Sequence, residues 1–331
     1  MTLSWQKVTL TLKETFSISY GNYSHREALI VSLSYKNFVG YGECTSIDYY
    51  GINLEDLIQK LKRCKDAIET NSIVYPNEFY KMVLNLDLGS FLTSALDCAY
   101  WDLFGKLEGK SFLELNEIIV NSIPDSSITI SVDSIENQIE KIQKSSWSKF
   151  KVKCNGFDKN SIEKLIEMPF DIALDSNGSY NESDCDWLQN QEFASKFTYL
   201  EQPMKPNQFS VLYRDKFANW MADEDCQSIE NLRSLQSHYR SVNIKLMKCG
   251  GLTPALELIQ EARKLDFKIM MGCMTESSIG ISAGCALSPL ADYCDLDGAN
   301  LIANDIANGS KIINGKIEIS DKPGLGIKIK N

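Results

Sequence analysis

Five charged residues in the second half of the chain recur at nearly even spacing, each at the end of a short apolar run. They are Lys153, Asp175, Glu201, Asp223 and Lys245. A parallel (β/α)₈ barrel repeats a strand every ~30 residues and carries its chemistry at the carboxyl ends of those strands. The spacing therefore predicts a barrel with three carboxylates and two lysines at one end, which are the components of a divalent-metal site flanked by two bases.

Short apolar runs from residue 128 onward alternate with helical patterns. The predicted strands are Ile128–Val132, Phe150–Lys153, Ile172–Asp175, Tyr199–Glu201, Trp220–Asp223, Asn243–Leu246, Ile269–Gly272 and Tyr293–Leu296. Alternating strands and helices predict a parallel sheet, and this number of strands in one block predicts closure into a barrel. The clearest helix is expected from Pro254 to Leu265, with Thr253 as its N-cap.

Residues 1–120 follow a different pattern. The expected antiparallel strands are Trp5–Thr11, Leu29–Tyr35 and Phe38–Glu43, and the expected helices are Leu54–Glu69 and Gly89–Leu107. Strands followed by helices predict an α+β unit. The tail, Lys311–Lys330, alternates again and is expected to return to this N-terminal unit.

Composition argues against several classes of protein. The formal net charge of −10 disfavours a nucleic-acid partner, and no stretch approaches the length needed to span a bilayer. The first residues alternate like a strand and lack the apolar block of a signal peptide. The ten cysteines scatter without CxxC pairs, so reduced thiols in a cytoplasmic protein are expected.

Asp175, Glu201 and Asp223 are expected at the ends of the third, fourth and fifth barrel strands. Neighbouring strands are ~4.8 Å apart, so carboxylates at one level on three of them can converge on one ion. Three hard oxygen ligands suit Mg²⁺ better than zinc. The alternative is that these acids are solvated or pair with neighbouring lysines.

Lys151 and Lys153 share one face of the second strand, because side chains on a strand alternate with period 2. Repulsion between close ammonium groups, together with a nearby metal, lowers a lysine's pKa from ~10.4 toward the range of a general base. Lys245 ends the sixth strand, nearly opposite. Two lysines on opposite sides of a carbon can remove and return a proton, as racemisation or epimerisation requires. A Schiff-base lysine is a competing interpretation, but it leaves the three carboxylates without a role.

Asp295 and Asp297 form a second acidic pair, at the end of the eighth strand. Period 2 directs both carboxylates toward the barrel mouth, where they can hold a substrate ammonium group by charge-assisted hydrogen bonds. The alternative is a pair of acids that caps the following helix.

Six segments near the strand ends carry a recognisable combination of motifs: KVKCNG (151–156), LDSNGSY (174–180), YLEQP (199–203), ADED (222–225), NIKLMKCGG (243–251) and MGCMTESSIG (271–280). They resemble the muconate-lactonizing-enzyme subgroup of the enolase superfamily, and the DLD at 295–297 is similar to its dipeptide epimerase branch. The resemblance extends to GYGECTSIDYYG (40–51), ALDCAYWDLFGKLEGK (95–110) and KPGLGI (322–327) and covers nearly the whole chain.

The resemblance implies a TIM-like (β/α)₇β barrel at residues 121–309 with an N-terminal α+β capping domain at residues 1–120, completed by residues 310–331. One Mg²⁺ per subunit would be bound by Asp175, Glu201 and Asp223. Asn177 and Glu224 would lie in supporting positions. The implied catalysts are Lys153 and Lys245, assisted by Lys151, and the implied substrate-binding residues are Asp295, Asp297, Arg26, Cys273 and Met274.

The implied reaction is a dipeptide epimerisation, best represented by L-Ala-D/L-Glu and typical of peptidoglycan turnover. The α-carbon of the C-terminal residue would invert by two-base proton transfer through an enediolate. Members of this branch can pair an acidic substrate side chain with an arginine in the first capping loop. This chain has Gly21 at that position, and Arg26 lies nearby.

Alternatives remain open within and outside this branch. The same barrel could carry out muconate cycloisomerisation, o-succinylbenzoate formation or N-succinylamino acid racemisation, but these substrates offer no free ammonium group to Asp295 and Asp297. From another class, a catalytically silent metal- or peptide-binding homologue is conceivable, although a binder has no need of two opposed lysines. The sequence leaves the oligomeric state open, a homo-oligomer included.

Overall fold

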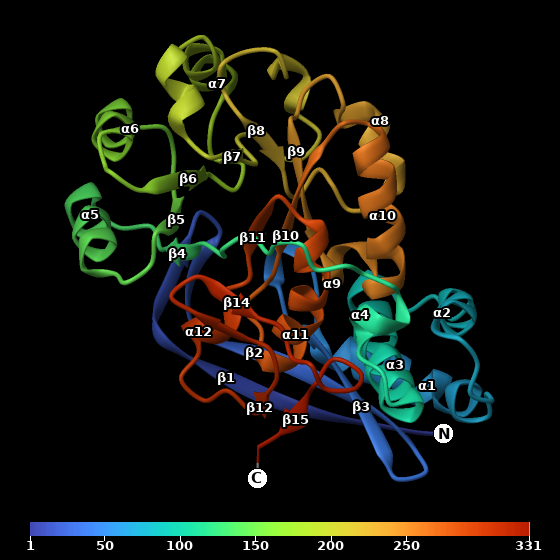
Figure 1. Cartoon of the computed structure of the whole chain (residues 1–331). Coiled ribbons are helices and arrows are strands. Elements are labelled where there is room, and N and C mark those ends of the chain that lie inside the picture. Colours follow the sequence, from blue (N-terminus) through green and yellow to red (C-terminus); the bar gives the residue numbers. More distant parts are fainter. Residues whose placement is uncertain (331) are drawn as a thin grey trace.

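The computed structural model describes residues 1–330 and contains an eight-stranded parallel sheet next to a smaller antiparallel unit (Figure 1). The parallel strands are β4 (Ile128–Ile130), β5 (Lys149–Lys153), β6 (Asp171–Asp175), β7 (Leu200–Glu201), β8 (Trp220–Ala222), β9 (Ser241–Lys245), β10 (Lys268–Gly272) and β11 (Tyr293–Asp295). Their order in the sheet follows the chain. An isolated bridge between Ser126 and Cys294 joins the two ends and nearly closes the barrel.

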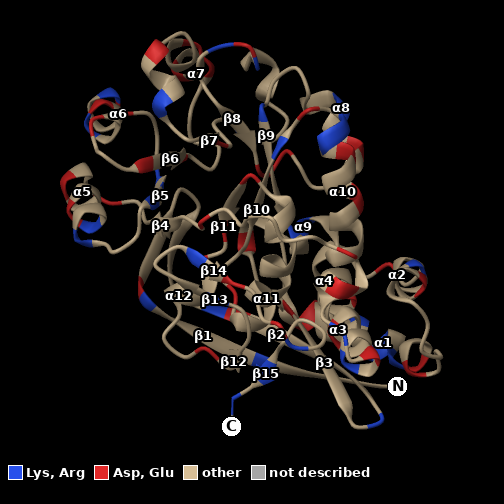
Figure 2. Ribbon diagram, in the orientation of Figure 1, with Lys and Arg blue, Asp and Glu red and all other residues tan. Residues whose placement is uncertain are grey.

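Helices follow most of the strands and cover the outside of the barrel (Figure 1). They are α5 (Ile135–Lys144), α6 (Lys159–Ile166), α7 (Glu182–Gln189), α8 (Leu232–Leu235), α9 (Leu246–Cys249), α10 (Leu252–Lys264), α11 (Ser278–Leu287) and α12 (Gly298–Leu301). Ser134, Asp158 and Asn181 cap α5, α6 and α7 with their side-chain oxygens. Charged residues of both signs lie along outer helices such as α5, α8 and α10 (Figure 2).

The start of α10 differs from the sequence prediction. The helix begins at Leu252 with Gly251 as its N-cap, rather than at Pro254 with Thr253 as the cap. The Thr253 hydroxyl donates instead to Asp97 Oδ1 at 2.7 Å, so the side chain is engaged outside its own helix.

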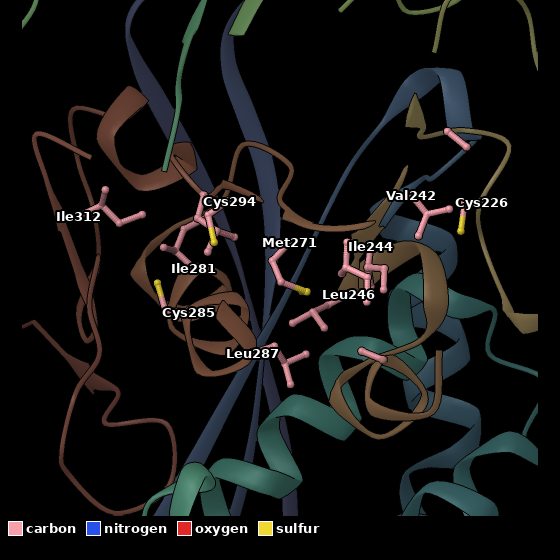
Figure 3. Packing of buried hydrophobic residues seen from close by; sticks show 14 of the residues in the cluster. Cys226, Val242, Ile244, Leu246, Met271, Ile281, Cys285, Leu287, Cys294 and Ile312 are labelled. Atoms are coloured by element: carbon pink, nitrogen blue, oxygen red, sulfur yellow. The ribbon is translucent and has the colours of Figure 1, made fainter. Parts of the chain in front are cut away.

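Side chains of the barrel strands alternate between the inside and the outside. Val242 and Ile244 of β9 and Met271 of β10 face outward and pack in one apolar layer with Leu287 of α11 (Figure 3). Ala173, Tyr199, Met221 and Met270 form a separate small cluster inside. The same alternation places the charged residues at the carboxyl ends on the inward face.

The N-terminal unit is a three-stranded antiparallel sheet covered by helices. Its elements are β1 (Thr2–Ile18), β2 (Gly21–Tyr35), β3 (Phe38–Thr45), α1 (Leu54–Glu69), α2 (Pro76–Leu84), α3 (Ser90–Glu108) and α4 (Phe112–Leu115). Gly40 and Gly42 of β3 bring the sheet directly against α3, because a Cβ at either position would fall within 2.1 Å of a helix carbonyl oxygen. A barrel with this N-terminal unit confirms the predicted fold class.

Two sets of buried contacts join this unit to the barrel, and a third joins it to the end of the chain. Asp97 of α3 accepts hydrogen bonds from the backbone N–H and the hydroxyl of Thr253. Glu43 of β3 accepts from the backbone and side chain of Ser277 at the start of α11. Near the end of the chain, the Leu325 N–H donates to Asp102 of α3.

The remaining strands pair with one another at the end of the chain: β12 (Ala307–Asn308) with β15 (Lys328–Ile329), and β13 (Lys311–Ile313) with β14 (Lys316–Glu318). Among the described helices, none combines the length and apolar character that crossing a membrane requires.

Candidate active site

The carboxyl ends of adjacent barrel strands bring the predicted charged residues together. Lys153, Asp175 and Glu201 are direct register partners on β5, β6 and β7, so they lie at one level. Asp223 follows β8, and Lys245 ends β9. All five side chains are buried, which excludes the simple interpretation of solvated strand-end acids.

The two predicted catalytic lysines lie on opposite sides of the barrel. β5 and β9 are four positions apart in the eight-stranded order, which places them across the barrel from each other. Lys153 Nζ lies 2.5 Å from Asp175 Oδ2, and Lys245 Nζ lies 2.7 Å from Asp223 Oδ2. Each lysine therefore has its own carboxylate partner.

Lys151 lies between three carboxylates. Its ammonium group pairs with Asp295 and lies 3.5 Å from Glu201 Oε2 and 3.6 Å from Asp175 Oδ2. Burial lowers the pKa of Lys151, but these carboxylates outweigh burial and raise the pKa well above its ordinary value. The expected lowering of the pKa is therefore wrong for Lys151, because neighbouring acids rather than ammonium groups dominate its surroundings.

The three predicted metal ligands differ in their ionisation. Burial raises the pKa of each, but Lys153 and Lys151 bring the pKa of Asp175 below its ordinary value, and Lys245 and Lys248 do the same for Asp223. Burial, then the charge of Asp175, raises the pKa of Glu201 to about 8. Glu201 Oε2 is buried and accepts no hydrogen bond from the described residues.

The donor set fits a small divalent cation. Three carboxylates offer hard oxygen ligands, and the buried Oε2 of Glu201 accepts no hydrogen bond from the described residues, although Lys151 Nζ lies 3.5 Å away. In these side-chain positions, however, no three His, Cys, Asp or Glu residues within 1–330 are grouped closely enough to hold a metal ion. Lysine ammonium groups lie against Asp175 and Asp223 instead. The alternative given in the sequence analysis, in which the acids pair with neighbouring lysines, therefore applies to Asp175 and Asp223.

Asn177 and Glu224 lie where the resemblance places supporting residues. The Asn177 side chain accepts a hydrogen bond from Lys153 at 3.0 Å and donates to Glu224 Oε1 at 3.3 Å. Its backbone N–H donates to Asp175 Oδ1 at 3.0 Å. Asn177 adopts a left-handed φ of 43°, a conformation that asparagine tolerates better than most residues. It thereby links one lysine to two carboxylates.

Two buried residues of the site were missed by the sequence analysis. Asn243 Nδ2 donates to Glu201 Oε1 at 2.7 Å, and Lys248 Nζ lies 2.5 Å from Asp223 Oδ1. Asn243 was detectable, because it lies two positions before Lys245 on the same strand and must face inward. Lys248 follows the strand on the short helix α9, where strand alternation no longer applies.

The two acids of the DLD motif have different partners. Asp295 accepts a hydrogen bond from Ser127 at 2.7 Å with Oδ1 and pairs with Lys151 through Oδ2. Asp297 Oδ2 accepts from the Thr129 backbone N–H at 2.6 Å. Burial, then the charge of Asp295, raises the pKa of Asp297 to about 7. Asp297 precedes α12 but makes no side-chain cap, so helix capping does not explain it.

A small cavity of about 40 Å³ lies above these residues. Its walls include Arg26, Cys273 and Met274, together with both predicted catalytic lysines. A larger cavity, of about 670 Å³, lies at the opposite end of the strands, near Ser241 and Lys268. Because barrel chemistry is carried by the carboxyl ends, the small cavity marks the site.

Arg26 is a buried cation without an acidic partner. It is 5% exposed, lies over the Tyr23 ring at 4.4 Å and donates from Nη1 to the Ser46 carbonyl oxygen at 3.0 Å. Its Nε is buried and finds no acceptor in the described chain. Since Arg26 also lines the cavity, its guanidinium is available to an anionic group placed there.

Two segments of the N-terminal unit cover the cavity. One is the β1–β2 turn, which contains Ser19 and Tyr20, and the other is the segment after β3 that contains Tyr49. The ring of Tyr20, between β1 and β2, stacks on Tyr49 with centroids 4.3 Å apart. Ser19 Oγ donates to the Asn177 carbonyl oxygen at 3.3 Å, so the β1–β2 turn touches the barrel. The volume of this cavity, about 40 Å³, is far below the roughly 300–1,000 Å³ of ordinary ligand pockets. A larger ligand therefore requires these segments to move.

Comparisons with known proteins bear on the family and the fold of the chain. A family model described as enolase C-terminal domain-like matches residues 135–331. A relative from Maribacter sp., named L-Ala-D/L-amino acid epimerase, is 35% identical over 338 residues and spans 99% of both chains. A solved enolase family member from Agrobacterium tumefaciens, with homology to dipeptide epimerases and with bound sodium and L-Ala-L-Glu, has a TM-score of 0.86 at 25% identity and covers 96% of this chain and 97% of its own.

A second solved structure supports the fold. The dipeptide epimerase from Methylococcus capsulatus, complexed with Mg and L-Arg-D-Lys, has a TM-score of 0.87 at 24% identity, with 98% of each chain covered.

Proposed function

The chain belongs to the enolase C-terminal domain-like family, and from this membership we propose that it is a dipeptide epimerase that inverts the α-carbon of the C-terminal residue. The observation that carries the proposal is the placement of Lys153 and Lys245 on opposite strands, both lining one cavity. One lysine can remove the α-proton from one face while the other delivers a proton to the opposite face. An isomerase needs no further reactant.

Asp175, Glu201 and Asp223 would hold one Mg²⁺ per subunit, and the bound ion would supply electrostatic stabilisation of the negative charge that develops on the substrate carboxylate. The Agrobacterium and Methylococcus structures contain sodium and Mg, respectively. All the proposed ligands come from a single chain, so a monomer and a homo-oligomer both contain a complete site.

Lys151 is better suited to stabilise charge than to act as a base. Its raised pKa keeps it protonated at neutral pH, so it can donate a hydrogen bond to the substrate carboxylate as the enediolate forms. Lys245 also has a pKa raised well above its ordinary value, since Asp223 and then Glu201 outweigh the lowering by burial. A protonated Lys245 can deliver a proton in the direction in which Lys153 is the base.

Asp297 is the better candidate for the substrate ammonium group. Both oxygens of Asp295 already have partners within the described chain, whereas Asp297 uses one oxygen for Thr129. A free amino terminus distinguishes dipeptides from the substrates of muconate cycloisomerase, o-succinylbenzoate synthase and N-succinylamino acid racemase. The Asp297 carboxylate therefore favours the dipeptide reaction over these alternatives.

Arg26 supports an acidic C-terminal residue in the substrate, as in L-Ala-L-Glu. Its guanidinium lines the cavity without a carboxylate partner, and an acidic side chain would supply one. Cys273 and Met274 form the neighbouring wall. We extend the proposal to a cytoplasmic role in peptidoglycan turnover, which is a source of such dipeptides.

The proposed division of the chain is a capping domain at residues 1–120, completed by 310–331, and a barrel at 121–309. Asn331 lies outside the described residues. The two covering segments belong to the proposed capping domain, so the substrate would be enclosed between the two domains.

Deuterium exchange at the α-carbon tests the function. The protein is incubated with Mg²⁺ and a dipeptide library in D₂O, and the C-terminal residue is followed by NMR and mass. The wild type should exchange the α-proton and invert the α-carbon, and the inversion should be lost in Lys153→Ala and Lys245→Ala. Lys144→Ala on the exposed face of α5 is a matched control that should retain it. Absence of exchange with every dipeptide would contradict the proposal and favour the racemase, cycloisomerase or silent-homologue alternatives.

A further inference from the structure

A second cavity lies directly beside the proposed active site. It has a volume of about 360 Å³ and is bounded by β1, β4 and α5, and by the end of α12. Phe16, Thr129 and Leu301 line both this cavity and the small cavity above the catalytic lysines. These shared side chains form a wall between the two spaces.

The wall adjoins the carboxylate proposed for the substrate ammonium group. Thr129 donates its backbone N–H to Asp297 Oδ2 at 2.6 Å, and Leu301 ends the helix that follows Asp297. In a dipeptide, the first side chain branches from the carbon that carries the ammonium group. A dipeptide held by Asp297 would therefore present its N-terminal side chain near this wall.

We propose that Phe16 and Leu301 limit the size of the N-terminal residue, and that the second cavity would receive a larger side chain if the wall were opened. This inference rests on the proposed dipeptide epimerase function. It predicts a preference for a small first residue such as alanine, by steric exclusion of larger ones. The walls of the second cavity include Leu12, Ile128 and Ile130, which an apolar side chain would contact. The other wall residues include the exposed Lys13, Glu14, Lys141 and Lys144.

The backbone around Leu301 is fixed on both sides, so truncation of its side chain should open the wall rather than let it collapse. Lys13 Nζ donates to the Asn300 carbonyl oxygen at 2.7 Å, and Asn300 Nδ2 donates to Ile312 O at 3.0 Å. On the other side, the Ala303 N–H donates to Thr11 O at 2.8 Å. A site that cannot relax keeps the space of the removed atoms.

The test compares two substrates that differ in their first residue, L-Ala-L-Glu and L-Phe-L-Glu. The wild type should prefer the alanine dipeptide, and Leu301→Ala should raise the kcat/KM ratio of the phenylalanine to the alanine dipeptide by about tenfold or more. Leu256→Ala is a matched control, because Leu256 is a half-buried leucine of α10 that lines neither cavity. Its ratio should equal that of the wild type. If Leu301→Ala folds poorly, Leu301→Val should give a smaller increase.

A double variant tests where the larger side chain goes. Ser131 lines only the second cavity, so Ser131→Phe added to Leu301→Ala should cancel the gain. A folded Leu301→Ala protein that exchanges the alanine dipeptide without any gain for phenylalanine would overturn this inference alone. A gain that survives Ser131→Phe would overturn the assignment of the second cavity. Lack of exchange with all dipeptides would overturn the proposed function, and this inference with it.

Discussion

The barrel and the N-terminal unit both place cations at the same cavity, but only the barrel cations have carboxylate partners among the described residues. On the barrel side, Lys151, Lys153 and Lys245 each lie within 4.0 Å of at least one carboxylate. On the other side, Arg26 is equally buried but has no carboxylate in ion-pair contact among the described residues. The barrel charges are compensated within the protein, whereas the arginine remains to be compensated by a ligand.

This difference separates chemistry from recognition. Compensated lysines are held in defined positions by their carboxylate partners. An uncompensated guanidinium costs free energy on burial, and a bound anion recovers that cost. Changes in the barrel should therefore affect the rate and the stability, and changes at Arg26 should affect the choice of substrate.

The largest expected effect concerns the stereochemistry of proton removal. Lys153→Ala and Lys245→Ala should each lower epimerisation by about 10²–10⁴-fold, the usual contribution of a general acid or base. Because the lysines face opposite sides of the cavity, each variant should still exchange the α-proton of one epimer, and the two variants should retain opposite epimers. The measurement is NMR in D₂O with separate L,L and L,D dipeptides. If both variants failed to exchange the α-proton of the same epimer, the opposed geometry would be contradicted.

The next effect concerns stability on the barrel side. Lys248 is buried and contacts Asp223 Oδ1, the Asp223 carbonyl oxygen and the Asn243 carbonyl oxygen. Lys248→Met would remove one partner of a buried ion pair, which typically costs about 3–5 kcal/mol. Urea unfolding should show this loss, and Lys264→Met on the surface of α10 should show almost none. Equal stability of the two variants would mean that Asp223 needs no second lysine.

A smaller effect is expected on the N-terminal side, and it should alter selectivity. A charge-assisted hydrogen bond contributes about 1.5–3 kcal/mol, so Arg26→Gln should reduce kcat/KM for L-Ala-L-Glu relative to L-Ala-L-Leu by about 10–100-fold. Arg63→Gln on α1 is a control distant from the cavity. If Arg26→Gln left this kcat/KM ratio unchanged, Arg26 would not pair with the acidic side chain of the substrate. The contrast between compensated barrel lysines and an arginine compensated by the ligand would then be wrong.

The sequence predicted the barrel side more fully than the N-terminal side, for a physical reason. Strand alternation and even spacing determine which residues of β5 to β9 face inward, so Lys153, Asp175 and Glu201 were predictable. The environment of Lys151 was not, because Asp295 reaches it from a strand far away in the sequence. The hydrogen bond of Arg26 depends on how β2 meets Ser46, the residue that follows β3, which no local pattern encodes.

The last expected effect, the smallest within any one pH unit, is a pH dependence of stability at the contact between the two regions. Burial raises the pKa of Asp97 from 3.8 to about 7, although hydrogen bonds from Thr253 oppose this shift. An acid with a raised pKa binds its proton more tightly in the folded state, so its contribution to stability is full below about pH 4 and is lost as the pH rises toward 7.

The slope from this single group should be at most about 1.4 kcal/mol per pH unit, since one proton is involved. Nearby Tyr80, Cys98 and Cys249 all have raised pKa values and stay neutral in this range, so they should not add to it. Urea unfolding between pH 4 and pH 7 should show a shallower decline for Asp97→Asn than for the wild type. Parallel curves would mean that Asp97 is ionised throughout and that the contact between α3 and α10 contains a permanent negative charge.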